Sequence, residues 1–182
     1  MNRGPTEDEV HFAGEAVRAF TEGLLRHPWS FRGPMLRGSI VMEFERLAAL
    51  RWGYEHCVGM CNATIGLLTI AVAANLKGKE IIVAPHSWCG TYSPFEFSGV
   101  RLVFAGEDNN GNLDPFFLPP LLTANTAAVL AVDWQGFPHD SAAIRSFCDE
   151  HSILYIADSS LVPQSAVRPD VQIVSFGPGK PI

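Results

Sequence analysis

Two side chains in the last part of the sequence have the types and positions needed for chemistry on a carbonyl group. Lys180 lies in a loop rich in glycine and proline that follows the apolar segment 171–174, and Asp158 ends another apolar segment, 153–157. A lysine amine can form a Schiff base with an aldehyde once burial or nearby positive charge has removed its proton. A carboxylate at a strand end can hold a protonated ring nitrogen. Taken alone, these residues could also be a solvated lysine and a turn aspartate.

Two further segments have residues that suit a phosphate and a flat ring. Ala63 and Thr64 follow Asn62 at the start of a predicted helix, where free amides and a hydroxyl favour a phosphate. Trp88 follows an apolar strand, 81–84, and an indole there can stack on a heteroaromatic ring. The structural alternatives are that Asn62 is an ordinary helix cap and that Trp88 belongs to the core or to an interface.

The order of these features favours one cofactor. Ligands of α/β proteins bind beyond the carboxyl ends of the strands, and each of the four features falls at a predicted strand end. Ser175, five residues before Lys180, can donate a hydrogen bond to the same phosphate. The combination predicts a pyridoxal phosphate (PLP) site, in which Lys180 and Asp158 are catalytic.

The elements that must position these residues follow an α/β rhythm. Strands are expected near 56–59, 80–84, 101–105, 127–132, 153–157 and 171–175, and helices near 63–76, 89–98, 113–122 (interrupted by proline) and 140–151. Alternating helices and doubly buried strands predict an α/β fold, a three-layer α/β/α domain with a mostly parallel sheet.

The region before this domain has a different organisation. A capping box at Thr6 and Glu9 opens a predicted helix, which an extended arm follows near 27–34. Ser39 is the predicted cap of a second helix, which Gly53 ends. We therefore predict an N-terminal helix and arm over 1–38 and a PLP-binding domain over 39–182.

Composition excludes several classes of function. The chain is 47% hydrophobic and 18% charged, which suits a buried parallel sheet or a large obligate interface. A net charge of −6 without a basic run argues against nucleic-acid or membrane partners. No apolar stretch reaches the roughly 20 residues of a membrane span, and no signal sequence is apparent. Four cysteines without a CxxC pair indicate reduced thiols in a cytoplasmic protein, and the histidine spacing predicts no metal.

Several segments resemble those of the DegT/DnrJ/StrS sugar aminotransferases, which are fold-type I PLP enzymes. These segments are FERLAAL (44–50), VGMCNATIGL (58–67), VAPHSWCGTY (83–92), VDWQGFPHDSAAI (132–144), ILYIADSS (153–160) and VSFGPGK (174–180). The resemblance implies that Ala63, Thr64 and Ser175 contact the phosphate, that Trp88 stacks on the ring, that Asp158 pairs with its nitrogen, and that Lys180 holds the cofactor. It also implies a small-molecule amino donor and acceptor.

The sequence departs from that family at three places. Ala63 stands where glycine is usual, and Leu161 stands where glutamine or histidine is usual. The stretch between Asp158 and Lys180 is also shorter. These departures bear on ordinary sugar transamination more than on PLP binding, and they leave elimination, condensation or cyclisation in natural-product biosynthesis open.

Members of that family continue for about as many residues again. Their next strand lies between the segments equivalent here to 56–59 and 171–175, and a small C-terminal domain follows. Without that strand two buried edges would lack hydrogen-bond partners. We therefore expect a split enzyme, completed by a second polypeptide in a heterodimer or heterotetramer. A non-catalytic subunit with a vestigial pocket and a piece of a longer enzyme are the alternatives.

Overall fold

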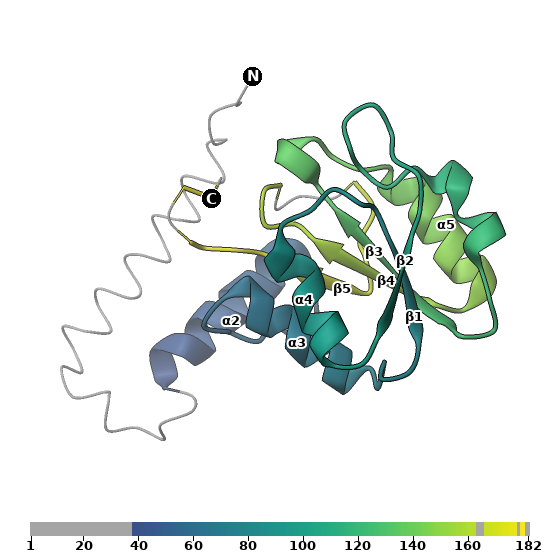
Figure 1. Ribbon diagram of the computed structural model, residues 1–182. Coiled ribbons are helices and arrows are strands. Elements are labelled where there is room, and N and C mark those ends of the chain that lie inside the picture. The colour runs from purple at the N-terminus through teal and green to yellow at the C-terminus, as the bar shows by residue number, and fades with distance from the viewer. Residues whose placement is uncertain (1–37, 163–165, 178, 181–182) are drawn as a thin grey trace. The chain divides into compact units, whose positions relative to one another are not determined.

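The computed structural model of the protein describes residues 38–162, 166–177 and 179–180 (Figure 1). These residues belong to two compact units, which divide between Met60 and Cys61. The predicted capping box at Thr6 and the predicted arm at 27–34 lie outside the described residues. The division into 1–38 and 39–182 therefore stays a prediction.

The first unit contains helix α2, Ser39–Trp52. Its N-cap is Gly38, in an extended conformation, so Ser39 is the first helical residue and the prediction that it caps the helix was wrong by one position. Gly53 ends α2 as predicted: it adopts the left-handed conformation, φ 71°, which places the following amide of Tyr54 2.9 Å from the carbonyl oxygen of Ala49.

The strand expected at 56–59 is not formed. Residues 56–60 have no strand hydrogen bonding, and Val58 is exposed. A strand exists through its hydrogen bonds to a neighbour, and no strand in the described part of the chain pairs with this segment. The segment is held instead by Glu45, whose carboxylate accepts a hydrogen bond from the amide of Gly59 at 2.8 Å.

The second unit is built on a five-stranded sheet in the order β2-β1-β3-β4-β5. The strands are β1 (Glu80–Val83), β2 (Arg101–Phe104), β3 (Thr126–Val132), β4 (Leu154–Asp158) and β5 (Val171–Ile173). Every pair of neighbours is parallel, which confirms the predicted α/β fold class. In a parallel sheet all the carboxyl ends lie at one edge, so the loops that follow the strands converge there.

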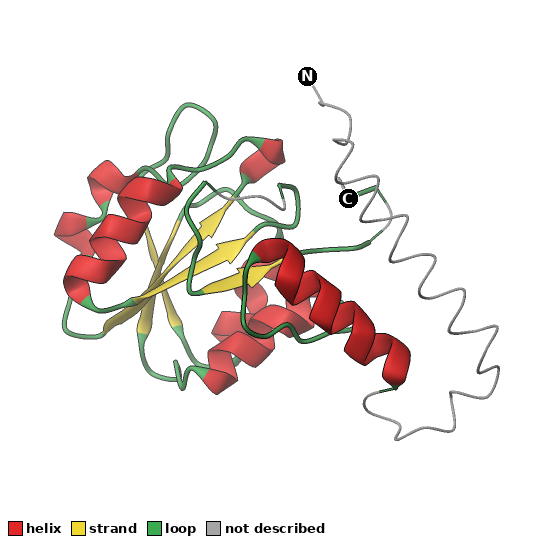
Figure 2. Ribbon diagram, turned by 180° about the vertical axis from the view of Figure 1, so that it is seen from behind, coloured by secondary structure: helices red, strands yellow, loops and turns green. Residues whose placement is uncertain are grey.

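Helices cover both faces of this sheet, which gives three layers (Figure 2). Helices α3 (Ala63–Ala73) and α4 (Cys89–Phe97) lie on one face, and α5 (Ser141–His151) lies on the other. Alternate strand residues point to opposite faces. One core cluster therefore joins Ile81, Leu130 and Ile156 to α3 and α4, and the other joins Ile82, Val129 and Tyr155 to α5. None of the described helices has the length and apolar character needed to cross a membrane.

Two predicted elements are shorter or tighter than expected, for identifiable reasons. The region near 113–122 forms two short 3₁₀ helices, η2 (Pro115–Phe117) and η3 (Pro119–Leu121), because its prolines cannot donate the hydrogen bonds of an α-helix. Strand β5 ends at Ile173 rather than Ser175, and among the described strands it pairs only with β4.

A buried polar group links β3 to β4 on the α5 side. Asp133, directly after β3, accepts hydrogen bonds from the backbone amide of His139 at 3.1 Å and from its ring Nδ1 at 2.7 Å. The other ring nitrogen, Nε2, hydrogen-bonds the hydroxyl of Tyr155 in β4. All three side chains are buried, so this group fixes the turn after β3 to its neighbouring strand.

Candidate functional site

Asp158 ends β4 with both carboxylate oxygens engaged. The hydroxyl of Thr91 donates to Oδ2 at 2.8 Å, and the hydroxyl and amide of Ser160 donate to Oδ1 at 2.5 and 3.2 Å. The aspartate is 6% exposed. The hydroxyl of its neighbour Ser159 is buried and has no hydrogen-bond partner within the described residues. Each carboxylate oxygen has further lone pairs, so Asp158 can accept a hydrogen bond from a cationic donor in addition.

The start of α3 presents two backbone amides. Asn62 caps the helix, because its side chain accepts a hydrogen bond from the amide of Ile65 at 2.9 Å. The amides of Ala63 and Thr64 come earlier in the first turn, where no carbonyl lies one turn before them. Capping by Asn62 is therefore compatible with anion binding at these two positions.

The first turn of α4 contacts both the start of α3 and the carboxylate of Asp158. A Cβ atom built at Gly90 would lie 2.7 Å from the hydroxyl oxygen of Thr64 and 2.9 Å from Cδ1 of Trp88. Glycine at this position therefore lets α3, the indole of Trp88 and α4 approach closely. The next residue, Thr91, donates the hydrogen bond to Asp158. Four predicted site residues, Ala63, Thr64, Trp88 and Asp158, thus lie around one helical turn.

Sequence reasoning missed Gly90 and Thr91. Neither belongs to a recognisable chemical pattern, although a glycine at the second position of a helix is a signal of close approach. The exposed fraction of Trp88 is 72%, so the indole belongs neither to the core nor to a covered part of this unit.

The loop that carries Lys180 and Ser175 is folded on itself. The Ser175 hydroxyl accepts a hydrogen bond from the amide of Gly177 at 3.4 Å, and the amide of Lys180 donates to the carbonyl of Gly177 at 3.1 Å. No hydrogen bond among the described residues joins Lys180 or Ser175 to Asp158, Trp88 or Thr64. Four of the six predicted residues are thus joined through the first turn of α4, and Ser175 comes two residues after Ile173 of β5, which pairs with Asp158.

Tyr92 holds the loop that leads from β1 to Trp88. Its hydroxyl donates to the carbonyl oxygen of Ala84. Burial raises the pKa of Tyr92 to about 12, and the negative charges of Glu107 and Asp158 act in the same direction. The phenol therefore stays protonated at neutral pH and keeps its donor role. No three His, Cys, Asp or Glu side chains in the described ranges are grouped as metal ligands.

The close approach at Gly90 can be tested by a single added methyl group. We expect Gly90→Ala to lower the free energy of unfolding by about 1–3 kcal/mol, because Thr64 and Trp88 must both move. Urea denaturation measures the change. Gly177→Ala is the matched control, since its added Cβ meets the Ser175 hydroxyl oxygen at an ordinary 3.5 Å. Equal stability of the two variants would contradict the packing described here.

Comparison with known proteins identifies the family to which this chain belongs. Residues 23–182 match the model of the DegT/DnrJ/EryC1/StrS aminotransferase family. The chain is 30% identical over 129 residues to a UDP-4-amino-4,6-dideoxy-N-acetyl-beta-L-altrosamine transaminase of Helicobacter pylori, a match that spans 69% of this chain and 34% of the relative.

Solved structures show the same likeness. The H. pylori aminotransferase PseC, involved in pseudaminic acid biosynthesis, superposes with a TM-score of 0.75 at 27% identity, over 92% of this chain and 46% of that one. An Escherichia coli GDP-4-keto-6-deoxy-D-mannose-3-dehydratase with bound hydrated PLP gives 0.68 at 25% identity, over 89% and 42%. The chain thus spans between about a third and a half of the length of these relatives.

Proposed function

Because the chain belongs to the DegT/DnrJ/EryC1/StrS aminotransferase family, we propose that it is the PLP-binding, lysine-bearing part of an aminotransferase that acts on a small keto or amino compound of the sugar type. The observation that carries this proposal is the first turn of α4, which contacts the start of α3 through Gly90 and the carboxylate of Asp158 through Thr91. An anion site can bind the phosphate of a phosphorylated pyridine, and a buried carboxylate can bind its protonated ring nitrogen.

PLP, the cofactor of this family, fits the residues present. The amides of Ala63 and Thr64 and the hydroxyl of Thr64 would hold the phosphate at the positive end of α3. The exposed indole of Trp88 would stack on the ring. Asp158 has its orientation set by Thr91 and would accept the hydrogen bond of the protonated ring nitrogen.

When bound, the cofactor supplies an electron sink for the substrate's α-carbon. Lys180 would attach the cofactor covalently and, once displaced by the amino donor, would move a proton to and from that carbon. Ser175 would add a hydrogen bond to the phosphate. Asp158 would keep the ring nitrogen protonated.

We further propose that a second polypeptide completes the enzyme. Strand β5 has one neighbour among the described strands, and the half-buried side chains of Val171 and Ile173 lie along it. A parallel strand added there would satisfy the remaining backbone groups of β5 and cover its apolar flank. The H. pylori relatives have more than half of their length beyond the matched part, and in this proposal a second polypeptide supplies the equivalent part in a heterodimer or heterotetramer.

The behaviour of the 182-residue chain alone tests the split arrangement. We expect aggregation or insolubility when it is expressed by itself, and recovery of soluble protein when the completing polypeptide is co-expressed. Size-exclusion chromatography with light scattering gives the result. A stable monomer from the chain alone would contradict the need for a partner while leaving the PLP proposal intact.

Elimination is the second candidate reaction. Leu161, three residues after Asp158, places an apolar side chain where the resemblance leads us to expect glutamine or histidine. One structural relative at 25% identity is a dehydratase of a sugar nucleotide, which removes water instead of transferring an amino group. The fate of the donor's nitrogen distinguishes the two reactions, because a transaminase leaves the nitrogen on the acceptor, whereas the product of an elimination lacks it.

A further inference from the structure

Three loops that follow β1, β2 and β3 form a connected rim at the carboxyl edge of the sheet. The loop after β2, 105–114, is called the middle loop because it contacts both of the others. It is held by its own hydrogen bonds. The Asp108 carboxylate accepts hydrogen bonds from the amides of Asn110 and Asn112 at 2.8 and 2.9 Å, and the amide of Asp114 donates to the carbonyl of Gly106 at 3.1 Å. This loop can therefore serve as an anchor for its neighbours.

The middle loop is tied to the loop after β3 through Asn112. The buried side chain of Asn112 donates to the carbonyl of Phe137 at 3.0 Å and accepts from the amide of Trp134 at 2.8 Å. Both hydrogen bonds join the Asn112 side chain to backbone groups that lie more than 20 residues later in the sequence, so they hold the backbone at Trp134 against the middle loop.

The middle loop is tied to the loop after β1 through Glu107. One carboxylate oxygen accepts a hydrogen bond from the backbone amide of His86 at 2.6 Å, and the other lies 2.5 Å from Nδ1 of the same residue. The imidazole also stacks on Trp134, with ring centroids 6.1 Å apart and an interplanar angle of 29°. The backbone and the ring position of His86 are thus both held by contacts.

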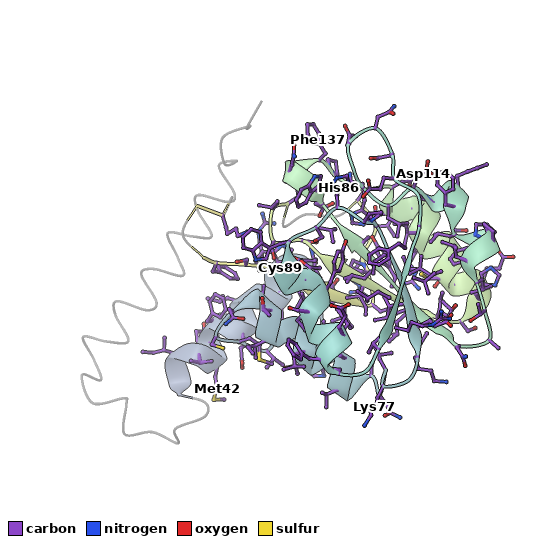
Figure 3. The ribbon with its side chains drawn as sticks, viewed as in Figure 1. Met42, Lys77, His86, Cys89, Asp114 and Phe137 are labelled. Carbon is purple, nitrogen blue, oxygen red and sulfur yellow. The ribbon has the colours of Figure 1, made fainter. Side chains whose placement is uncertain are left out.

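This fixed imidazole is open to solvent. The His86 side chain, which is labelled in Figure 3, is 64% exposed. Its Nε2 has no hydrogen-bond partner within the described residues. Ordering an exposed side chain costs conformational entropy, and a carboxylate, an indole and a rigid loop are committed to it. Such preorganisation is typical of a group that binds a ligand.

We propose that His86 is a substrate-contacting residue whose Nε2 forms a hydrogen bond with a hydroxyl group of the substrate, and that Glu107 is its positioning residue. Glu107 engages Nδ1, so Nε2 is the ring atom that is left to contact a ligand. The rim lies at the carboxyl edge of the sheet, which also carries Asp158 and Trp88. Trp88 comes two residues after His86 in the sequence. The inference rests on the proposed function and names a residue for its substrate side.

Three variants separate recognition of a hydroxyl from a structural role. His86→Phe keeps a ring against Trp134 and removes the ring nitrogens. His86→Gln returns an amide that can form a hydrogen bond. Glu107→Gln replaces the carboxylate by an amide with one oxygen, which cannot accept the hydrogen bonds of both the His86 backbone amide and Nδ1, so one of the two contacts that position the imidazole is lost.

The probes are UDP-4-amino-4,6-dideoxy-N-acetyl-β-L-altrosamine, which has a hydroxyl group, and L-glutamate, which has none, each as amino donor to the complete PLP-loaded enzyme. We expect His86→Phe and Glu107→Gln to raise the KM of the amino sugar about tenfold, His86→Gln to restore much of this loss, and the KM of L-glutamate to stay unchanged. An equal rise for both donors, or no rise for the amino sugar, would overturn the proposal. Absence of the lysine-bound PLP absorbance band in the unmodified enzyme would instead count against the proposed function.

Discussion

Lys180→Ala is expected to abolish covalent attachment of PLP and to lower kcat by roughly 10⁴-fold, the contribution of a positioned proton-transfer group together with its nucleophilic role. The visible absorbance band of lysine-bound PLP should be absent from the variant. The folded state should persist, because Lys180 lies after the last described strand and, within the described residues, its one hydrogen bond runs from its backbone amide to the carbonyl of Gly177. Thermal unfolding of the variant should therefore match that of the unmodified protein.

Two matched controls make this result specific. Lys180→Arg keeps the positive charge and the side-chain length but does not form the covalent bond, so it should behave as the alanine variant does. Lys79→Ala removes an exposed lysine next to β1, at the amino end of the strands, and should change neither the band nor kcat. A Lys180→Ala variant that retains the band would remove this residue from the proposed site.

Asp158→Asn is expected to lower kcat by roughly 10²–10³-fold, in line with the loss of one preorganised electrostatic contact in an active site. Asparagine keeps the shape of the side chain, and its oxygen can still accept the hydrogen bond from Thr91, while the backbone amide of Ser160 loses its acceptor. The carboxylate's negative charge is lost, however, and a neutral amide does not stabilise a proton on the cofactor's ring nitrogen. PLP should remain attached to Lys180.

Asp140→Asn is the control for this substitution. Asp140 caps α5 by accepting a hydrogen bond from the amide of Ala143 at 3.0 Å, and asparagine is an equally good cap. The control should leave kcat unchanged. Steady-state kinetics at saturating donor gives both results, and an Asp158→Asn variant with normal kcat would show that the carboxylate does not act on the ring.

The sequence pattern was sufficient to predict the strands of the sheet and its helices, because apolar runs and helix signals are local features of the sequence. The strand at 56–59 was predicted wrongly because its apolar residues satisfy the local pattern, whereas a strand also needs a neighbour that the sequence cannot specify. Ser39 was placed one residue off because an extended Gly38 serves as cap without a side chain.

The site was only partly predictable for the same reason. Residues at strand ends, such as Asp158 and Trp88, can be found by position, since parallel strands deliver them to one edge. The contacts of Gly90 with Thr64 and of Thr91 with Asp158 join segments 26 and 67 residues apart in the chain, and Glu107 reaches His86 across 21 residues. No spacing rule covers such pairs, because they depend on how α3, α4 and the loops pack.

The most direct measurement is to reduce the PLP-loaded enzyme with borohydride and to map the modified peptide by mass spectrometry. The chain has three lysines, Lys77, Lys79 and Lys180, so the assignment is unambiguous. We expect one pyridoxyl group per chain, on Lys180. A pyridoxyl group on Lys77 or Lys79, or no modification of a protein that still catalyses the reaction, would contradict it.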